Sequence, residues 1–142
     1  MKNWTELVID SHYLTAIEVK KSLEAGNSRE AEEGIEQLID ATARADRRAV
    51  KSQLVRLMKH IIKWKVQAEK RSSSWIRFIH NARIEIQDIQ EETPSITNDV
   101  IISLWDLAFN LAVAEAEDEI GHIVVFVPSL NWDEVFDAEY LL

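Results

Sequence analysis

The chain has 142 residues, of which 46% are hydrophobic and none is cysteine, and its formal net charge is −9. Disulfides, thiol nucleophiles and thiolate metal sites are therefore excluded, and without a secretory signal or an apolar run of about 18 residues we expect a cytoplasmic protein with no membrane partner. The length fits one domain, so we expect residues 1–142 to form a single helical domain.

Apolar residues at helical spacing predict five helices, and the scarcity of glycine and proline supports them. The first runs from about Ser11 to Ala25 and is stopped by Gly26. The second begins after a cap at Asn27 or Ser28. The third covers about Asp46 to Gln67, with apolar and basic residues on opposite faces. The sequence leaves open whether the second and third helices are continuous through residues 42–44.

The fourth predicted helix opens at serines 72–74 and ends before Pro94, because the residue before a proline avoids helical geometry. The fifth is capped by Ser95 or Thr97 and reaches about Glu119. Apolar residues cover most of its circumference, which is typical of a helix buried on several sides. We therefore expect it at the centre of the bundle or in a dimer interface.

After Gly121, the β-branched run at residues 123–127 is too short to form a sheet and predicts an extended segment across the bundle. Asn131 then caps a short helix to about Phe136. The predicted fold class is all-α, a bundle of about five helices with a short extended segment and a short C-terminal helix.

Charge is distributed unevenly along the chain. Residues 44–83 hold twelve of the sixteen Lys and Arg residues and only two acids, a local net charge of +10. Residues 1–43 carry four bases and nine acids, and residues 84–142 carry fourteen acids and no base. The basic segment must either pair with the acidic parts of its own chain or face an anionic partner.

A long motif runs from Leu54 to Trp75 and resembles the pattern of the domain of unknown function family twenty-nine, a group of small, largely cyanobacterial proteins. The acidic and aromatic ending, Trp132 to Tyr140, is also similar to that family. Ala68 and Leu14 replace a family proline and a family tryptophan. The resemblance implies an all-α fold and supplies no catalytic residues. The residues that fit the central pattern are His60, Lys63, Trp64, Gln67, Arg71, Ser74, Trp75 and Arg83.

Six of these residues form a candidate anion or partner site, because cations and aromatic rings would gather if the third and fourth helices form an antiparallel hairpin. Arginine offers a planar fork for phosphate or carboxylate. In the competing interpretation, which we favour, the tryptophans are core residues and the cations bind the acidic fifth helix or the C-terminal tail. The six residues are His60, Lys63, Trp64, Arg71, Trp75 and Arg83.

Other reactive patterns are weak. Glu119 and His122 have the Glu-x-x-His spacing of di-iron bundles, and Glu115 is near them, but such sites need two copies of that motif. Serines 72–74 have the composition of a helix cap and not of a nucleophile. We therefore predict no catalytic residues, no metal ligands and no cofactor.

The favoured functional hypothesis is a non-catalytic protein that binds another protein or a second copy of itself through surplus apolar surface on the fifth helix or residues 123–127. The alternative is an anion- or nucleic-acid-binding module that uses residues 44–83, which requires bases that the chain's own acids do not neutralise. An enzyme has the least support from the sequence.

Overall fold

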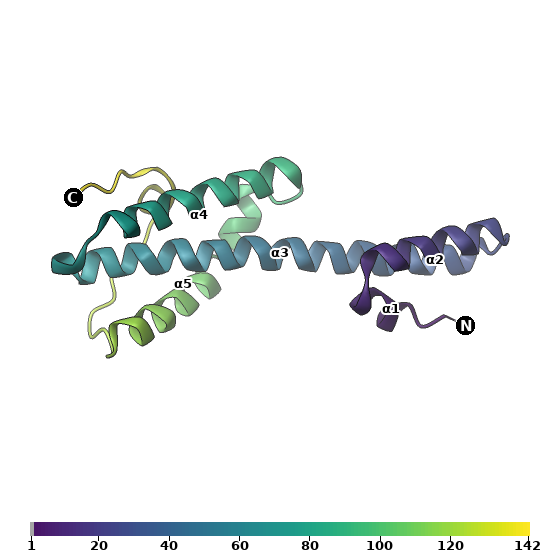
Figure 1. The fold of residues 1–142 in the computed structure, drawn as a ribbon, viewed down its shortest axis with the longest axis horizontal. Helices are drawn as coiled ribbons and strands as arrows, with labels where there is room; N and C mark the ends of the chain where they lie inside the picture. The colour runs from purple at the N-terminus through teal and green to yellow at the C-terminus, as the bar shows by residue number, and fades with distance from the viewer. Residues whose placement is uncertain (1) are drawn as a thin grey trace. The chain divides into compact units, whose positions relative to one another are not determined.

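The computed structural model describes residues 2–142 and confirms the all-α fold (Figure 1). No β-strand occurs in these residues. Contacts divide the chain into two compact units, an N-terminal unit, Met1–Arg47, and a C-terminal unit, Arg48–Leu142. The elements are α1 (Trp4–Asp10), α2 (His12–Glu24), α3 (Ser28–Val66), η1 (Ala68–Lys70), α4 (Ser73–Glu92), α5 (Asn98–Ile120) and the one-turn π-helix η2 (Asp133–Asp137).

The structure settles one open helix boundary and adds one helix that was not predicted. The second and third predicted helices are one helix, the 39-residue α3. Thr42 does not interrupt it, because its hydroxyl donates to the carbonyls of Leu38 and Ile39 at 2.8 and 3.1 Å. The short α1 was not predicted, since its seven residues hold too little of a helical period to be recognised.

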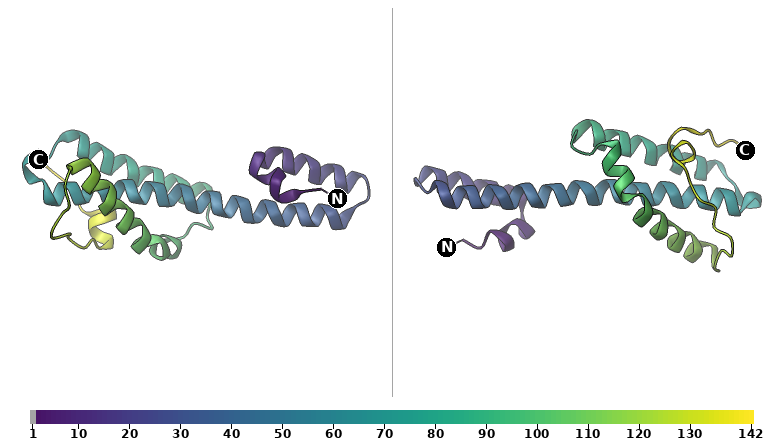
Figure 2. Two further views of the ribbon diagram at one scale, coloured as in Figure 1. Left: turned by 90° about the horizontal axis from the view of Figure 1, so that it is seen from below. Right: turned by 180° about the vertical axis from the view of Figure 1, so that it is seen from behind.

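The N-terminal unit is a helical hairpin with α1 on one face. α2 and the start of α3 run antiparallel (Figures 1 and 2), and Gly26, with a φ of +79°, makes the turn between them in a conformation that favours glycine. Trp4, Val19 and Ala31 form a small buried core, which Leu7 and Leu38 extend.

Gly34 permits the close approach on which this small core depends. A Cβ atom at Gly34 would lie 2.7 Å from Cγ2 of Val19 and 2.8 Å from Cζ3 and Cη2 of Trp4. Those distances are well inside van der Waals contact, so any side chain there would push α1 or α2 away from α3.

We predict that Gly34→Ala destabilises the N-terminal unit. At an unhindered helix position, Gly→Ala stabilises by about 0.5–1 kcal/mol, whereas the overlap here should cost about 1–3 kcal/mol. Amide hydrogen exchange across residues 4–41 of the full chain measures the change. Ala43→Gly, at an exposed site on the same helix, gives the helix-propensity effect alone. Slower exchange in Gly34→Ala would contradict the prediction.

The C-terminal unit packs α4, α5 and the C-terminal segment around the second part of α3 (Figure 2). The predicted apolar face of α3 is confirmed. Its fully buried side chains include Val50, Leu54, Leu57, Met58 and Ile61.

Within one copy of the chain, α5 is buried on one side and is not the central helix of the bundle. Its buried face consists of Ile101 and a row of small residues, Ala108, Ala112 and Ala116, which are four positions apart and completely buried. Large apolar residues on the flanks stay in solvent, with Ile102 57% and Leu107 50% exposed. Alanine side chains allow α5 to pack closely on its neighbours, and the longer apolar side chains on its flanks remain exposed.

The chain after α5 is irregular and largely uncovered. Gly121 ends α5 with a φ of +93°, and residues 122–131 form neither helix nor strand. The predicted cap at Asn131 is present, because its side chain accepts from the Glu134 amide at 2.8 Å while the Glu134 carboxylate accepts from the Asn131 amide at 3.2 Å. This reciprocal pair is a capping box that starts η2.

Candidate functional site

Acids at the end of α5 neutralise part of the basic face of α3. Lys59 Nζ lies 3.6 Å from Glu115 and 3.3 Å from Glu119, and Lys63 Nζ lies 3.0 Å from Glu119. Both lysine side chains are only 14% exposed. These pairs agree with the favoured interpretation, in which the cations bind the acidic fifth helix.

The carboxyl of Glu119 responds to these lysines. Burial alone would raise its pKa, but hydrogen bonds from Lys63 and Lys59 outweigh burial, so the net shift is downward. The carboxylate is therefore held in its charged form as an ion-pair partner and is not poised to exchange a proton near neutral pH.

A second group of contacts, which we call the C-terminal clamp, attaches the end of the chain to α3 and α4. Arg83 donates from Nε to the Val135 carbonyl at 2.8 Å and from Nη2 to the Glu134 carbonyl at 3.2 Å. The hydroxyl of Tyr140 donates to the same Glu134 carbonyl at 2.6 Å. Lys65 forms an ion pair with the Glu134 carboxylate and lowers its pKa. The clamp thus consists of Lys65, Arg83 and Tyr140 around residues 134–135.

Trp64 and Arg71 extend the clamp at the end of α3. The Trp64 ring is buried and meets the Tyr140 ring edge-on, with centroids 5.6 Å apart. The guanidinium of Arg71 lies over the Trp64 ring, 4.8 Å from its centroid. The Nε of Arg71 donates to the Trp64 carbonyl at 2.8 Å. That carbonyl belongs to the last turn of α3, where no helical amide is available to it, so Arg71 caps the helix.

His60 and Trp75 also have structural partners. His60 Nδ1 lies 2.8 Å from the Arg56 carbonyl, so Nδ1 carries the proton, and the ring packs on Phe78 with centroids 4.8 Å apart. Burial lowers the pKa of His60 despite that hydrogen bond. The ammonium of Lys63 lies 4.8 Å from the Trp75 ring.

The six predicted site residues therefore lie in one unit but do not converge on one cavity. We expected Arg71 and Arg83 either to meet carboxylates of the chain or to line an open cleft. Instead, both donate a hydrogen bond from Nε to a backbone carbonyl. Arg83 also borders a small hollow of about 170 Å³ beside His80 and Glu139, between α4 and the C-terminal segment.

Sequence reasoning missed Lys59, Lys65 and Tyr140 as members of these contacts. Tyr140 lies in the acidic and aromatic ending, and that motif was the available signal. The sequence contains no signal for the carbonyl acceptors of Glu134 and Val135, because every residue carries a backbone carbonyl.

The structure does not bring the residues of the weaker metal hypothesis together as ligands. Glu115 and Glu119 bind lysines, and His122 Nδ1 lies 3.0 Å from the Ile123 carbonyl. Within residues 2–142, no cluster of three or more histidine or carboxylate side chains could hold a metal ion. None of the helices in that range combines the length and apolar character that crossing a membrane requires.

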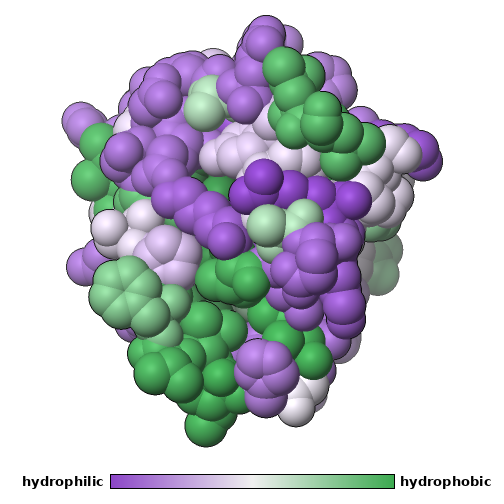
Figure 3. Space-filling model, turned by 90° about the vertical axis from the view of Figure 1, so that its left-hand side faces the viewer, coloured by the Kyte–Doolittle hydropathy of each residue, from purple (hydrophilic) through white to green (hydrophobic). Residues whose placement is uncertain are grey.

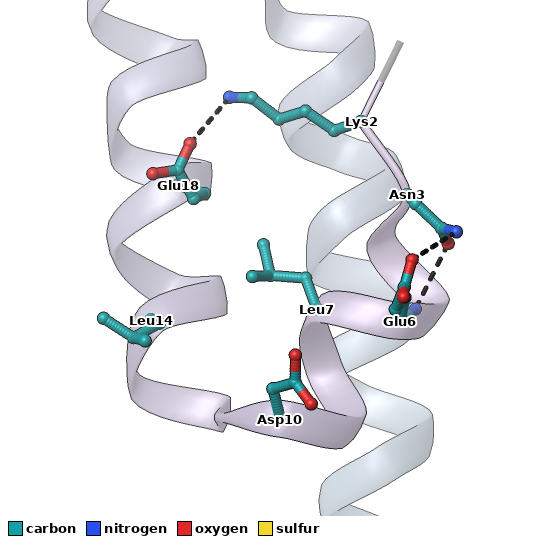
Figure 4. Close-up of a pocket in the computed structure, with 7 residues that line it drawn as sticks. All are labelled: Lys2, Asn3, Glu6, Leu7, Asp10, Leu14 and Glu18. Atoms are coloured by element: carbon teal, nitrogen blue, oxygen red, sulfur yellow. Dashed lines mark hydrogen bonds and ion pairs between the residues drawn. The ribbon is translucent and has the colours of Figure 1, made fainter.

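The N-terminal unit has a separate hollow of about 460 Å³ between α1 and α2 (Figure 4). Leu7 and Leu14 lie on either side of it, with Lys2 and Glu18 at one end. Lys2 Nζ lies 3.2 Å from the Glu18 carboxylate, and its hydrogen bond, followed by that of Lys21, lowers the Glu18 pKa. Lys2 thus ties α1 to α2.

These observations define an all-helical protein in which the cations and rings of the central motif hold the C-terminal segment in place. The model of the family described as domain of unknown function DUF29 matches residues 10–141, and the chain belongs to that family. The match covers the motif and the C-terminal clamp and starts at the last residue of α1. The chain matches no curated protein and no solved structure.

We predict that Arg83→Met loosens the C-terminal clamp. Two buried carbonyls would lose a charged donor, which should cost the C-terminal unit about 1–3 kcal/mol. Urea unfolding gives the loss, and hydrogen exchange should accelerate selectively in residues 130–140. Arg77→Met, at an exposed site on the same helix, should change stability by less than about 0.5 kcal/mol. Equal effects of the two variants would contradict a clamp at Arg83.

We predict that acidification destabilises the C-terminal unit through His60. Because burial lowers its pKa in the folded state, the unfolded chain binds the proton first. Stability is therefore full above the unfolded pKa of about 6.5 and falls as the pH drops below it towards the folded pKa. Urea unfolding between about pH 8 and pH 5 measures the slope. His60→Gln should flatten it, whereas His80→Gln, at an exposed site, should not; an unchanged slope in His60→Gln would refute this origin.

Proposed function

We propose that the protein is a non-catalytic, cytoplasmic protein-binding module that receives its partner on the segment from Ile123 to Phe126. The observation that carries this proposal is the exposure of Val125 (99%), Phe126 (84%) and Ile123 (77%). Apolar side chains gather low on the face shown in Figure 3, where the chain leaves α5. Contiguous apolar surface of this kind marks interaction sites in soluble proteins.

The backbone of this segment supports recognition by strand pairing. Within residues 2–142, Val124 supplies the one amide of residues 123–127 that donates a hydrogen bond, to the Glu117 carboxylate at 2.8 Å. The other amides of residues 123–127 have no acceptor within the described residues, and a bound extended peptide could supply one, adding main-chain hydrogen bonds to side-chain contacts. The β-branched composition favours that pairing.

An apolar hollow of about 370 Å³ gives a second point of attachment further along the chain. Ile102 and Trp105 of α5 line it together with Leu130 and Trp132. The rings of Trp105 and Trp132 are stacked, with centroids 5.9 Å apart, and both are partly exposed. Partly exposed tryptophans beside a pocket are common energetic centres of protein interfaces.

Two considerations favour this function over the anion- or nucleic-acid-binding alternative. Arg71 and Arg83, the centre of that alternative, are already committed to carbonyls. Lys59 and Lys63 are paired with acids of α5. At these four residues a phosphate would have to displace existing contacts before it could bind, which lowers its net affinity there.

We expect Val125→Asp with Phe126→Asp to abolish partner binding and leave the fold intact, because both side chains are exposed. Immobilised full chain would capture the partner from the native cell lysate, and calorimetry with the purified partner would then measure affinity. The affinity should fall at least about 100-fold, as for loss of two central contacts.

The matched control is Ile9→Asp, at a residue of the N-terminal unit that is 78% exposed. It should bind as the wild type does. Failure to recover any specific polypeptide, or equal binding by the double variant, would contradict the proposal. Retardation of RNA by the wild type at low salt would instead favour the alternative.

A further inference from the structure

The hairpin of the N-terminal unit has one covered face and one uncovered face. α1 covers the first, where Trp4 lies against Gly34 and Lys2 reaches Glu30 at 3.8 Å. Lys2 also reaches Glu18 at 3.2 Å (Figure 4). The buried core on that side consists of three residues. A unit below about 50 residues with so small a core has little stability of its own.

The position of the second face follows from helical geometry. On α2, Val19 faces Gly34 of α3. Leu23 is four residues later and therefore lies about 40° further round, on the side away from Glu18 and α1. Ala16 lies about 60° beyond Val19 in the same direction.

The matching side of α3 is also apolar. Gly34 faces Trp4 of α1, and the core residue Leu38 lies about 40° further round the helix. Ile35 and Ile39 lie beyond Leu38, about 100° and 140° from Gly34, and so point away from α1. Leu23, Ile35 and Ile39 are 53%, 42% and 60% exposed. We call Ala16, Leu23, Ile35 and Ile39 the hairpin face.

We propose that a second copy of the chain covers the hairpin face, so that two hairpins form an antiparallel four-helix arrangement. Two-fold interfaces are self-complementary, and an apolar face on a helical hairpin is the usual building block of such bundles. A two-fold axis parallel to the helices places α2 of each copy on α3 of the other, antiparallel and at the same level.

The charges around the hairpin face fit this arrangement. The face itself carries no charge, so no like charges meet at its centre. Lys20 lies on the outer edge of α2, about 100° from Val19, and Glu32 lies on the outer edge of α3, about 160° from Gly34; both are exposed. Val19 is level with Gly34, so Lys20 of one copy comes level with Glu32 of the other. Opposite charges at the rim select this register over the inverted one.

The size of the face sets the expected affinity. α2 has 13 residues and is about 20 Å long, so two such helices offer a contact smaller than the roughly 800 Å² per partner of a standard interface. We therefore expect a dimer that dissociates in the micromolar range.

Sedimentation velocity of the full chain tests the proposal. The wild type should shift from one to two chain masses between about 1 and 100 µM, and its melting temperature should rise with concentration. Leu23→Lys with Ile39→Lys should remain at one chain mass throughout. Ile9→Lys, which adds one positive charge at an exposed site on α1, should dimerise normally. Circular dichroism confirms that each variant keeps its helices.

Two outcomes would overturn the proposal. One is a wild type that stays monomeric at about 100 µM. The other is a dimer that survives Leu23→Lys with Ile39→Lys. A dimer abolished instead by Val125→Asp with Phe126→Asp would place self-association on the segment after α5. The hairpin face and the proposed partner site therefore succeed or fail separately.

Discussion

The C-terminal unit depends on large residues of α3 packing against small residues of α5. Leu54, Leu57 and Ile61 are completely buried, and so are Ala108 and Ala112. Each large side chain contributes about 1.5–3 kcal/mol on burial, far more than an exposed ion pair, which contributes about 0–1 kcal/mol. The lysine and glutamate pairs therefore orient α5 on α3, whereas apolar burial holds it there.

Polar residues of the central motif serve the fold in a different way. Arg71 caps α3 through a carbonyl of its last turn, and Arg83 holds the carbonyls of residues 134–135. Tyr140 connects the contacts of Arg83 with those of Arg71. Its hydroxyl donates to the same Glu134 carbonyl as Arg83, and its ring contacts Trp64, on which Arg71 lies. Backbone groups outside regular structure need such donors when water is excluded. The cations and aromatic rings of the central motif thus hold the C-terminal segment against the helices.

Sequence patterns predicted the apolar face of α3, the stop at Gly26 and the cap at Asn131, because each depends on the residues' own periodicity or conformational preference. They did not predict the short α1, whose stability depends on Trp4 fitting the space above Gly34. They also overstated the burial of α5 within one copy of the chain, since periodicity does not reveal how closely alanines bring two helices together. For the candidate site, residue types identified the cations, but their carbonyl acceptors have no signature in the sequence.

The uncovered run after α5 has a consequence for colloidal behaviour. Residues 123–127 are five consecutive β-prone, uncharged residues, three of them exposed, and they resemble the segments that nucleate aggregation. The acids at residues 117–119, just before this run, and Asp133, after it, act as gatekeepers that keep copies apart. That protection weakens as the solution approaches the isoelectric point of about 4.9, so solubility should be lowest in mild acid and should recover in alkaline buffers of low ionic strength.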